Sequence, residues 1–223
     1  MESIDLMIYN LALGLPGMLI AVVAHEVAHG AMALHFGDPT AKDAGRLSMN
    51  PIVHLDLLGS VIMPLIGAVL GGVMFGWAKP VPINPRNFPS DAKGIRRAIF
   101  WVSFAGPLTN FILMIISGFL MVVIAKYASP DFYLYEPLVE ILKQSVYINT
   151  IIGAFNLIPI PPLDGSKMVS AFLSYNAQMK YDELSKYGMI FLLILLFTGV
   201  ARYIFFPFIF VAQKVLELFY SIL

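Results

Sequence analysis

Five apolar runs constrain this chain more than any other feature of its sequence. They cover residues 6–34, 55–77, 98–125, 138–160 and 188–222. Each run is long enough to approach or cross a hydrocarbon core, which needs about 20 helical residues. Hydrophobic residues make up 59% of the chain and charged residues only 13%, whereas soluble proteins carry about a quarter charged residues. The sequence therefore predicts an α-helical polytopic membrane protein with about five to six membrane-embedded helical segments.

The domain organisation follows from how few residues lie outside these runs. We expect a single domain over residues 1–223, with a core at 8–175 and C-terminal helices at 186–222. No appended PDZ-like or ligand-sensing module fits in the remainder, and there is no nucleic-acid motif to suggest such a partner. The first run lacks a basic flank and is too long for the apolar part of a signal peptide, so we expect it to be retained.

The charges outside the apolar runs predict a topology. Residues 78–97 contain five basic residues and one acidic residue, whereas 126–140 contain three acidic residues and one basic residue. Basic loops remain in the cytoplasm, which places 78–97 inside and 126–140 outside. We expect a multi-pass protein of the cell membrane. The oligomeric state is not indicated by any sequence feature.

The first apolar run contains VAHEVAHG, residues 23–30, which brings His25, Glu26 and His29 into a membrane helix. In a helix the two histidines are one turn apart on one face, so both imidazoles can bind one metal. This is the HExxH pattern, in which the histidines bind zinc and the glutamate handles the proton of activated water. Interior histidines satisfied by hydrogen bonds are the alternative, but ionisable groups within membrane spans are costly and usually functional.

A catalytic zinc site needs a third protein ligand and one open position. The chain has no cysteine, so that ligand must be nitrogen or oxygen. Asp164 is the only carboxylate in the apolar neighbourhood of FNLIPIPPLDG, residues 155–165, whose three prolines exclude a regular helix. Its alternative role is the N-cap of the following helix. Because HExxH needs a third ligand, we favour Asp164 as that ligand and expect His35 at the membrane boundary.

Three motifs in this order resemble the site-2 protease family of intramembrane zinc metalloproteases. They are HEVAH, AGPLTN at 105–110 and NLIPIPPLDG, and the resemblance extends over about residues 8–175. It is strongest to the short, minimal group that lacks soluble regulatory domains. The resemblance implies an endopeptidase that hydrolyses peptide bonds in or near transmembrane segments of other membrane proteins, with those segments and the lipid bilayer as partners.

The resemblance also assigns roles to individual residues. It implies one zinc ion per chain and Glu26 as the catalytic base, with three zinc ligands: His25, His29 and Asp164. Asn156 matches the leading asparagine of the third motif, and its amide could stabilise an oxyanion or hold the substrate backbone. A purely structural role in the loop is the alternative for Asn156.

Other features of these motifs leave room for different functions. We expect Gly106 and Asn110 of the second motif to serve helix packing.

A membrane ion or metal transporter would also combine broken helices with ionisable residues, and an inactive family member would keep the fold alone. Glu26 argues against a transporter, because a metal pathway needs no general base beside its ligands.

The apolar run at 55–77 is interrupted by Pro64, Gly67, Gly71 and Gly72, which suit a broken hairpin better than a continuous span. We expect it to enter and leave the membrane on the cytoplasmic side. Its returning limb, roughly 76–84, is then expected to form a small re-entrant β element near the active site. An unwound substrate could pair with this edge, with Lys79 and Val81 as the pairing candidates.

His54 lies just before this run and has two alternative roles. It could belong to the polar start of a helix near the membrane interface. It could instead reach the zinc in a resting state and occupy the open position, which would make it a latency device.

Overall fold

The computed structural model describes residues 2–56, 59, 62 and 78–223. No β-strand occurs among these residues. The α-helices are α1 Glu2–His35, α2 Thr40–Asp43, α4 Ala92–Tyr127, α5 Tyr135–Asn156, α6 Asp164–Ser170, α7 Tyr175–Asp182, α8 Ser185–Phe197 and α9 Ala201–Ile222. Two short 3-10 helices, η1 Pro51–His54 and η3 Pro85–Asn87, lie between α2 and α4.

Three of the described helices are long and apolar enough to cross a membrane. They are Ala12–His35 within α1, Ala92–Tyr127 and Ala201–Ile222. The expected five to six membrane segments are therefore not confirmed. Helix α5 has 22 residues but carries charged residues in its first half, and α8 has only 13 residues. The run at 55–77 falls mostly outside the described residues, and so does the expected hairpin.

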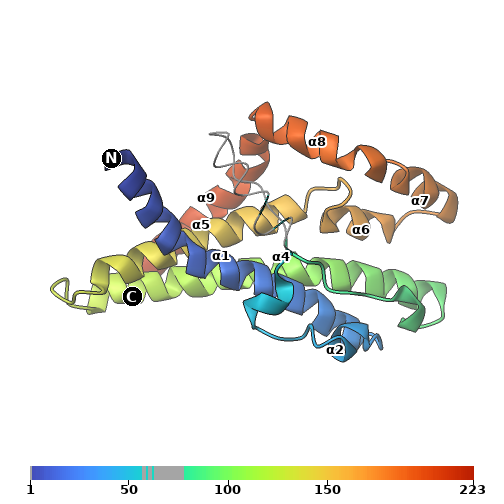
Figure 1. Ribbon diagram of the computed structural model, residues 1–223, viewed down its shortest axis with the longest axis horizontal. Helices are drawn as coiled ribbons and strands as arrows, with labels where there is room; N and C mark the ends of the chain where they lie inside the picture. Colours follow the sequence, from blue (N-terminus) through green and yellow to red (C-terminus); the bar gives the residue numbers. More distant parts are fainter. Residues whose placement is uncertain (1, 57–58, 60–61, 63–77) are drawn as a thin grey trace.

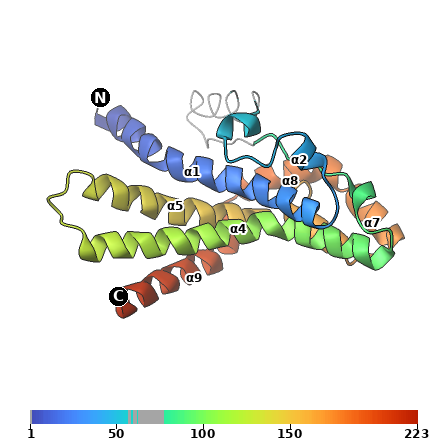
Figure 2. The same cartoon turned by 90° about the horizontal axis from the view of Figure 1, so that it is seen from below.

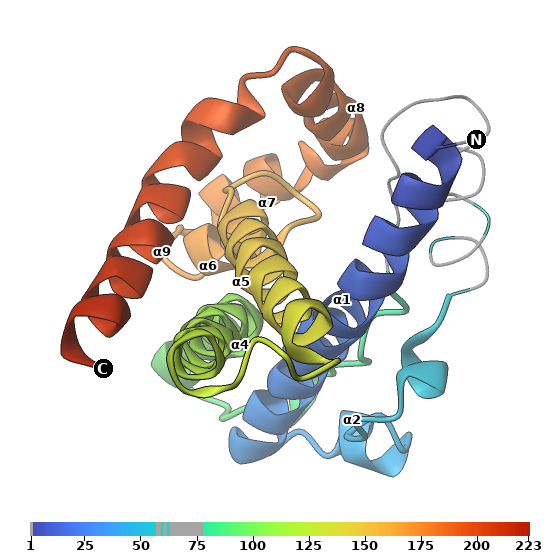
Figure 3. The same ribbon diagram turned by 90° about the vertical axis from the view of Figure 1, so that its left-hand side faces the viewer.

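Helices α1, α4 and α5 form the central bundle (Figure 1). In Figure 2, α1 and α5 run from left to right, while α4 and α9 run in the opposite direction. Figure 3 shows α9 and α1 on opposite sides of the α4–α5 pair. The N-terminus, the α4–α5 connection and the C-terminus consequently lie at one end of the bundle.

A seam of buried polar side chains joins the three central helices. Asn110 of α4 donates from Nδ2 to the carbonyl of Ala21 in α1 (3.1 Å) and to Oδ1 of Asn149 in α5 (3.0 Å). Further along, the hydroxyls of Ser117 and Ser145 are 2.9 Å apart. Lipid tails are as apolar as leucine, so polar contacts and small residues supply much of what holds membrane helices together.

The proline-rich segment after α5 is non-helical, as expected. Helix α5 ends at Asn156, and α6 begins at Asp164. The backbone comes very close here: a Cβ added at Gly165 would collide with the carbonyl of Leu157, and one at Gly188 would collide with the carbonyl of Pro161. These two glycines let α6 and α8 pack directly against the segment, which fixes where Asp164 lies.

The expected β element at 76–84 is not confirmed. Residues 78–84 are described and carry no strand, while 76–77 lie outside the described residues. The physical reason lies in Pro80 and Pro82, which cannot donate to a β-ladder. The segment instead runs without a partner strand alongside α1.

Candidate metal centre

Three buried ligand atoms meet where α1 packs against α4 and α6. His25 and His29 lie one turn apart on α1, and Asp164 is the first residue of α6. Asp164 Oδ2 lies 3.1 Å from each Nε2 atom, and the two Nε2 atoms are 3.0 Å apart. All three residues are no more than 7% exposed. Among the described residues they form the one group of this kind that could hold a metal ion.

The hydrogen bonds behind the histidines fix their tautomers. His25 Nδ1 lies 2.6 Å from Oδ1 of Asn110, and His29 Nδ1 lies 2.6 Å from the carbonyl of Val102. The orientation of the Asn110 amide is settled because its Nδ2 faces the Ala21 carbonyl. Both partners of the histidines are therefore acceptors, so each Nδ1 carries a proton and donates it. In the neutral imidazoles, both Nε2 atoms then present lone pairs to each other and to Asp164.

This donor set fits zinc. Two imidazole lone pairs and a carboxylate oxygen lie 3.0–3.1 Å apart, an arrangement that is repulsive unless a proton or a cation is shared. Tetrahedral zinc with bonds of about 2.0–2.1 Å holds its ligand atoms about 3.3 Å apart. Zinc-binding histidines also typically donate their other ring N–H to a carbonyl or carboxylate. Three protein ligands leave a fourth position open, as catalytic zinc requires.

Asp164 does not take the alternative role of a helix N-cap. The N-cap position of α6 is Leu163, and no side chain caps this helix end. The Oδ2 atom of Asp164 faces the histidines, while its Oδ1 lies 3.6 Å from Nζ of Lys167, whose side chain is mostly exposed. The carboxylate thus directs one oxygen to the metal group and the other to a lysine.

Glu26 lies beside the ligand group but is not part of it. One residue along a helix corresponds to a rotation of about 100°, so Glu26 projects from the side of α1 next to the face that carries His25 and His29. Its Oε2 accepts a 2.8 Å hydrogen bond from the backbone N–H of Val81. The carboxylate is half-buried and lies between α1 and the segment that follows the 55–77 run.

Three other residues that the sequence analysis singled out make contacts outside the metal group: His54, Asn156 and Lys79. His54 is buried, and its Nε2 is 2.8 Å from the carbonyl of Ser48. It does not belong to the metal group in the described part of the chain, and its latency role stays a prediction. The Asn156 amide donates to the Ile152 carbonyl of its own helix (3.1 Å), and Lys79 donates its N–H to the His54 carbonyl (2.9 Å).

Two residues of the second motif contribute more to the site than the packing role predicted from the sequence. Asn110 holds His25, as described above. A Cβ added at Gly106 would lie 2.5 Å from Nε2 of His29 and 2.6 Å from Nε2 of His25. Gly106 therefore keeps space open beside both ligand nitrogens. A glycine in the middle of an apolar span was the available signal, but the sequence does not tell which helix faces it.

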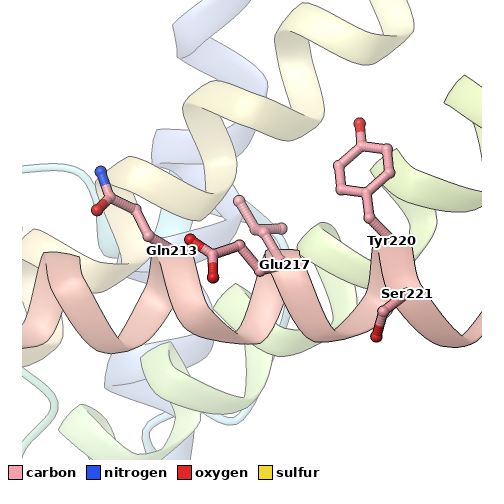
Figure 4. Close-up of a pocket in the computed structure, with 5 residues that line it drawn as sticks. Gln213, Glu217, Tyr220 and Ser221 are labelled. Carbon is pink, nitrogen blue, oxygen red and sulfur yellow. The ribbon is translucent and has the colours of Figure 1, made fainter.

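Two hollows of the described structure lie away from the metal group. One, of about 540 Å³, runs along the end of α9 (Figure 4) and is lined by Gln213, Leu216, Glu217, Tyr220 and Ser221. A second, of about 570 Å³, lies between α4, α5 and α9. Neither is lined by a residue of the metal group.

The chain is similar to proteins named as zinc metalloproteases. The family model described as "Peptidase family M50" matches residues 121–198, which include Asn156 and Asp164. "Putative zinc metalloprotease YwhC" of Bacillus subtilis (strain 168) is 34% identical over 207 residues, which cover 92% of this chain and 90% of that protein. "Putative zinc metalloprotease Rip2" of Mycolicibacterium smegmatis is 25% identical over 194 residues, or 87% of this chain and 70% of that protein. No solved structure gives a significant match.

Proposed function

The chain belongs to peptidase family M50, the site-2 protease family, and we propose that within it this zinc metalloprotease is an intramembrane endopeptidase. Its substrates on this proposal are peptide bonds in or near transmembrane segments of other membrane proteins. One observation carries the proposal: both histidines of the buried metal group lie within Ala12–His35, a helix long and apolar enough to cross a membrane. We place the protein in the cell membrane, with several membrane passes.

The proposed chemistry divides between the ligands and the base. When bound by His25, His29 and Asp164, zinc supplies a Lewis acid that activates water and polarises the scissile carbonyl. Glu26 accepts the proton that water loses as its oxygen adds to the carbonyl carbon. Glu26 then passes this proton to the amine nitrogen as the C–N bond breaks. Asn156 would donate its amide to the developing oxyanion after releasing the Ile152 carbonyl.

The proposed position of the site within the membrane limits which peptide bonds can be substrates. The carbonyls of a transmembrane helix are already hydrogen-bonded within that helix, so a bond is presentable only where the segment unwinds. We therefore expect substrates with helix-weakening residues near the cut. A transporter is the rival class, but Glu26 stands outside the ligand group and next to it in sequence, as a general base does. The presence of all three ligands and this base also argues against an inactive relative.

A comparison of membrane proteomes tests the proposed function. Membranes from cells that produce the wild type should contain truncated single-span proteins, and membranes from cells with Glu26→Gln should contain the same proteins intact. The cuts should cluster within or at the edge of the spans. Identical fragments with both variants, or fragments confined to soluble proteins, would contradict intramembrane proteolysis by this chain.

A labelling experiment tests the topology on both sides of the 55–77 run. The N–H of Lys79 donates to the carbonyl of His54 (2.9 Å), so the two ends of this run meet. A single pass through about 30 Å of hydrocarbon would separate them. The chain has no cysteine; we therefore expect Ser48→Cys and Arg86→Cys to be labelled from the same side by an impermeant thiol reagent.

Tyr133 provides the control for this labelling. It is 80% exposed in the α4–α5 connection, which the charge pattern places outside. Tyr133→Cys should therefore be labelled from the side opposite to the other two cysteines. Labelling of positions 48 and 86 from opposite sides would replace the re-entrant arrangement with a spanning helix.

A further inference from the structure

The sequence Pro80-Val81-Pro82 presents a single backbone donor. Proline has no N–H, so only Val81 can donate from these three residues. Its N–H donates to Glu26 Oε2 at 2.8 Å. The one available donor of this stretch is thus directed at the proposed catalytic base.

The chain before Val81 is held from two sides. The Arg46 guanidinium donates from Nη2 to the Lys79 carbonyl at 2.6 Å. The Lys79 N–H donates to the His54 carbonyl at 2.9 Å. Arg46 and His54 are both buried, whereas Lys79 is exposed, so the two bonds attach this exposed residue to the buried part of the structure.

The chain after Val81 is held by Asp38, a buried residue just beyond the end of α1. Asp38 accepts from the N–H of Asn84 (2.6 Å) and from Nδ2 of Asn87 (2.8 Å). Burial opposes ionisation of this carboxyl, but hydrogen bonds from Thr40, Asn87 and Asn84 outweigh it and hold the pKa of Asp38 below its usual range. Asp38 is therefore ionised at neutral pH and can accept these hydrogen bonds. Gly37, with φ of 98°, provides the left-handed turn that brings Asp38 back toward this chain segment.

Helix α1 leaves space for Val81 because it carries a glycine at position 30. Glu26 and Gly30 are four residues apart and share one helix face. A Cβ added at Gly30 would lie 3.0 Å from Cγ1 of Val81, and Val81 is only 6% exposed. The absent side chain at Gly30 lets the segment approach closely enough for its amide to reach Glu26.

We propose that the backbone amide of Val81 positions Glu26 for catalysis. It holds Oε2 in a fixed direction and leaves Oε1 to receive the proton of the attacking water. This inference rests on the proposed function, because it takes Glu26 as the base. It also assigns the Val81 N–H to the enzyme's own carboxylate, in place of the expected pairing with a substrate strand. The hydrogen bonds before and after Val81 hold this segment in place against α1.

Amide hydrogen exchange tests the contact without any substrate. The full chain is compared as wild type and Glu26→Ala, in lipid nanodiscs, with and without zinc. We expect the Val81 amide to exchange at least about 10-fold faster in Glu26→Ala, because its acceptor is gone. Equal exchange rates in the two proteins would overturn the proposal. This outcome is independent of whether the chain cleaves any membrane protein.

Kinetics distinguish positioning from the other roles of Val81. The probe is a single-span reporter protein with a central Asn-Pro pair in its transmembrane segment. Val81→Pro removes the N–H, whereas Val81→Ala keeps it and removes side-chain packing. We expect kcat to fall about 10–100-fold further in Val81→Pro than in Val81→Ala, with KM and zinc content unchanged. A raised KM alone would indicate substrate pairing, and a larger loss in Val81→Ala would indicate packing.

A backbone ester covers the case in which Val81→Pro disturbs the fold or loses zinc. Cell-free synthesis with the hydroxy-acid analogue of valine replaces the N–H by oxygen and keeps the side chain. The ester protein should show the same loss of kcat at full zinc content. Normal kcat in the ester protein would overturn the proposal. An uncut reporter with the wild type would count against the proposed function, and hydrogen exchange would then decide the positioning role separately.

Discussion

We expect Glu26→Gln to leave zinc bound and to abolish proteolysis, whereas alanine at any of the three proposed ligand positions should remove zinc and activity together. This result is expected because Glu26 stands outside the metal group, which consists of His25, His29 and Asp164. Glutamine keeps the shape of the side chain but cannot accept the proton, and loss of a general base costs about 10²–10⁴-fold in rate. Zinc per chain, measured by mass spectrometry on purified protein, and cleavage of a single-span reporter provide the two readouts.

His35→Ala is the matched control for the ligand variants. His35 is exposed at the end of the same helix, so its replacement should change neither zinc content nor rate. Full zinc in Asp164→Ala would mean that the third ligand lies elsewhere. Loss of zinc in Glu26→Gln would move this glutamate from the role of base to that of ligand.

The members of the metal group could be predicted from the sequence because each of the two stretches that contain them carries its own signal. His25 and His29 share a helix face by the periodicity of the helix alone, and the structure places both Nε2 atoms within 3.1 Å of Asp164 Oδ2. Asp164 could be identified because a carboxylate in a long apolar neighbourhood is costly unless it is paired or bound to a metal. Three nearby prolines also marked the end of the helix before it.

The number of membrane segments was harder to predict from the sequence than the members of the metal group. Apolar runs were counted by composition, and the run at 138–160 looked long enough to cross a membrane. The structure ends α5 at Asn156 and begins it at Tyr135, which adds Glu136 to a helix that also contains Glu140 and Lys143. The described helix therefore combines a charged first half with an apolar second half. Composition does not reveal where a helix begins.

The hydrogen bonds that orient the site residues join residues far apart in the sequence, and no local sequence pattern predicts such contacts. His29 and Val102 are 73 residues apart in sequence, His25 and Asn110 are 85 apart, and Glu26 and Val81 are 55 apart. Each pair depends on which faces of two helices or segments meet. The sequence indicated a helix-packing role for Asn110, and only the fold identifies His25 of the metal group as its partner.

Gly106→Ala is expected to displace the metal site while the bundle remains folded. Its Cβ would lie 2.5–2.6 Å from both Nε2 atoms, a separation at which neighbouring atoms must shift. The imidazoles have little room to retreat, because Asn110 and Val102 each hold one of them through Nδ1 at 2.6 Å. Either α4 moves away from α1, or the ligand atoms lose their common centre. Overpacking of this kind costs about 1–3 kcal/mol, which a helical bundle can tolerate.

The catalytic cost of Gly106→Ala should be much larger than its structural cost. A displacement of about 1 Å at a reacting centre can cost on the order of 10²-fold in rate, and ligands that no longer converge also bind zinc more weakly. Zinc content and reporter cleavage should therefore fall together, while thermal unfolding shifts only slightly. Gly118→Ala on the same helix is the control, since the one close contact of its Cβ would be with the end of the Leu216 side chain, at 2.8 Å, which can rotate away. Full zinc and wild-type cleavage in Gly106→Ala would show that the space beside the two histidines is not where the metal and its open position lie.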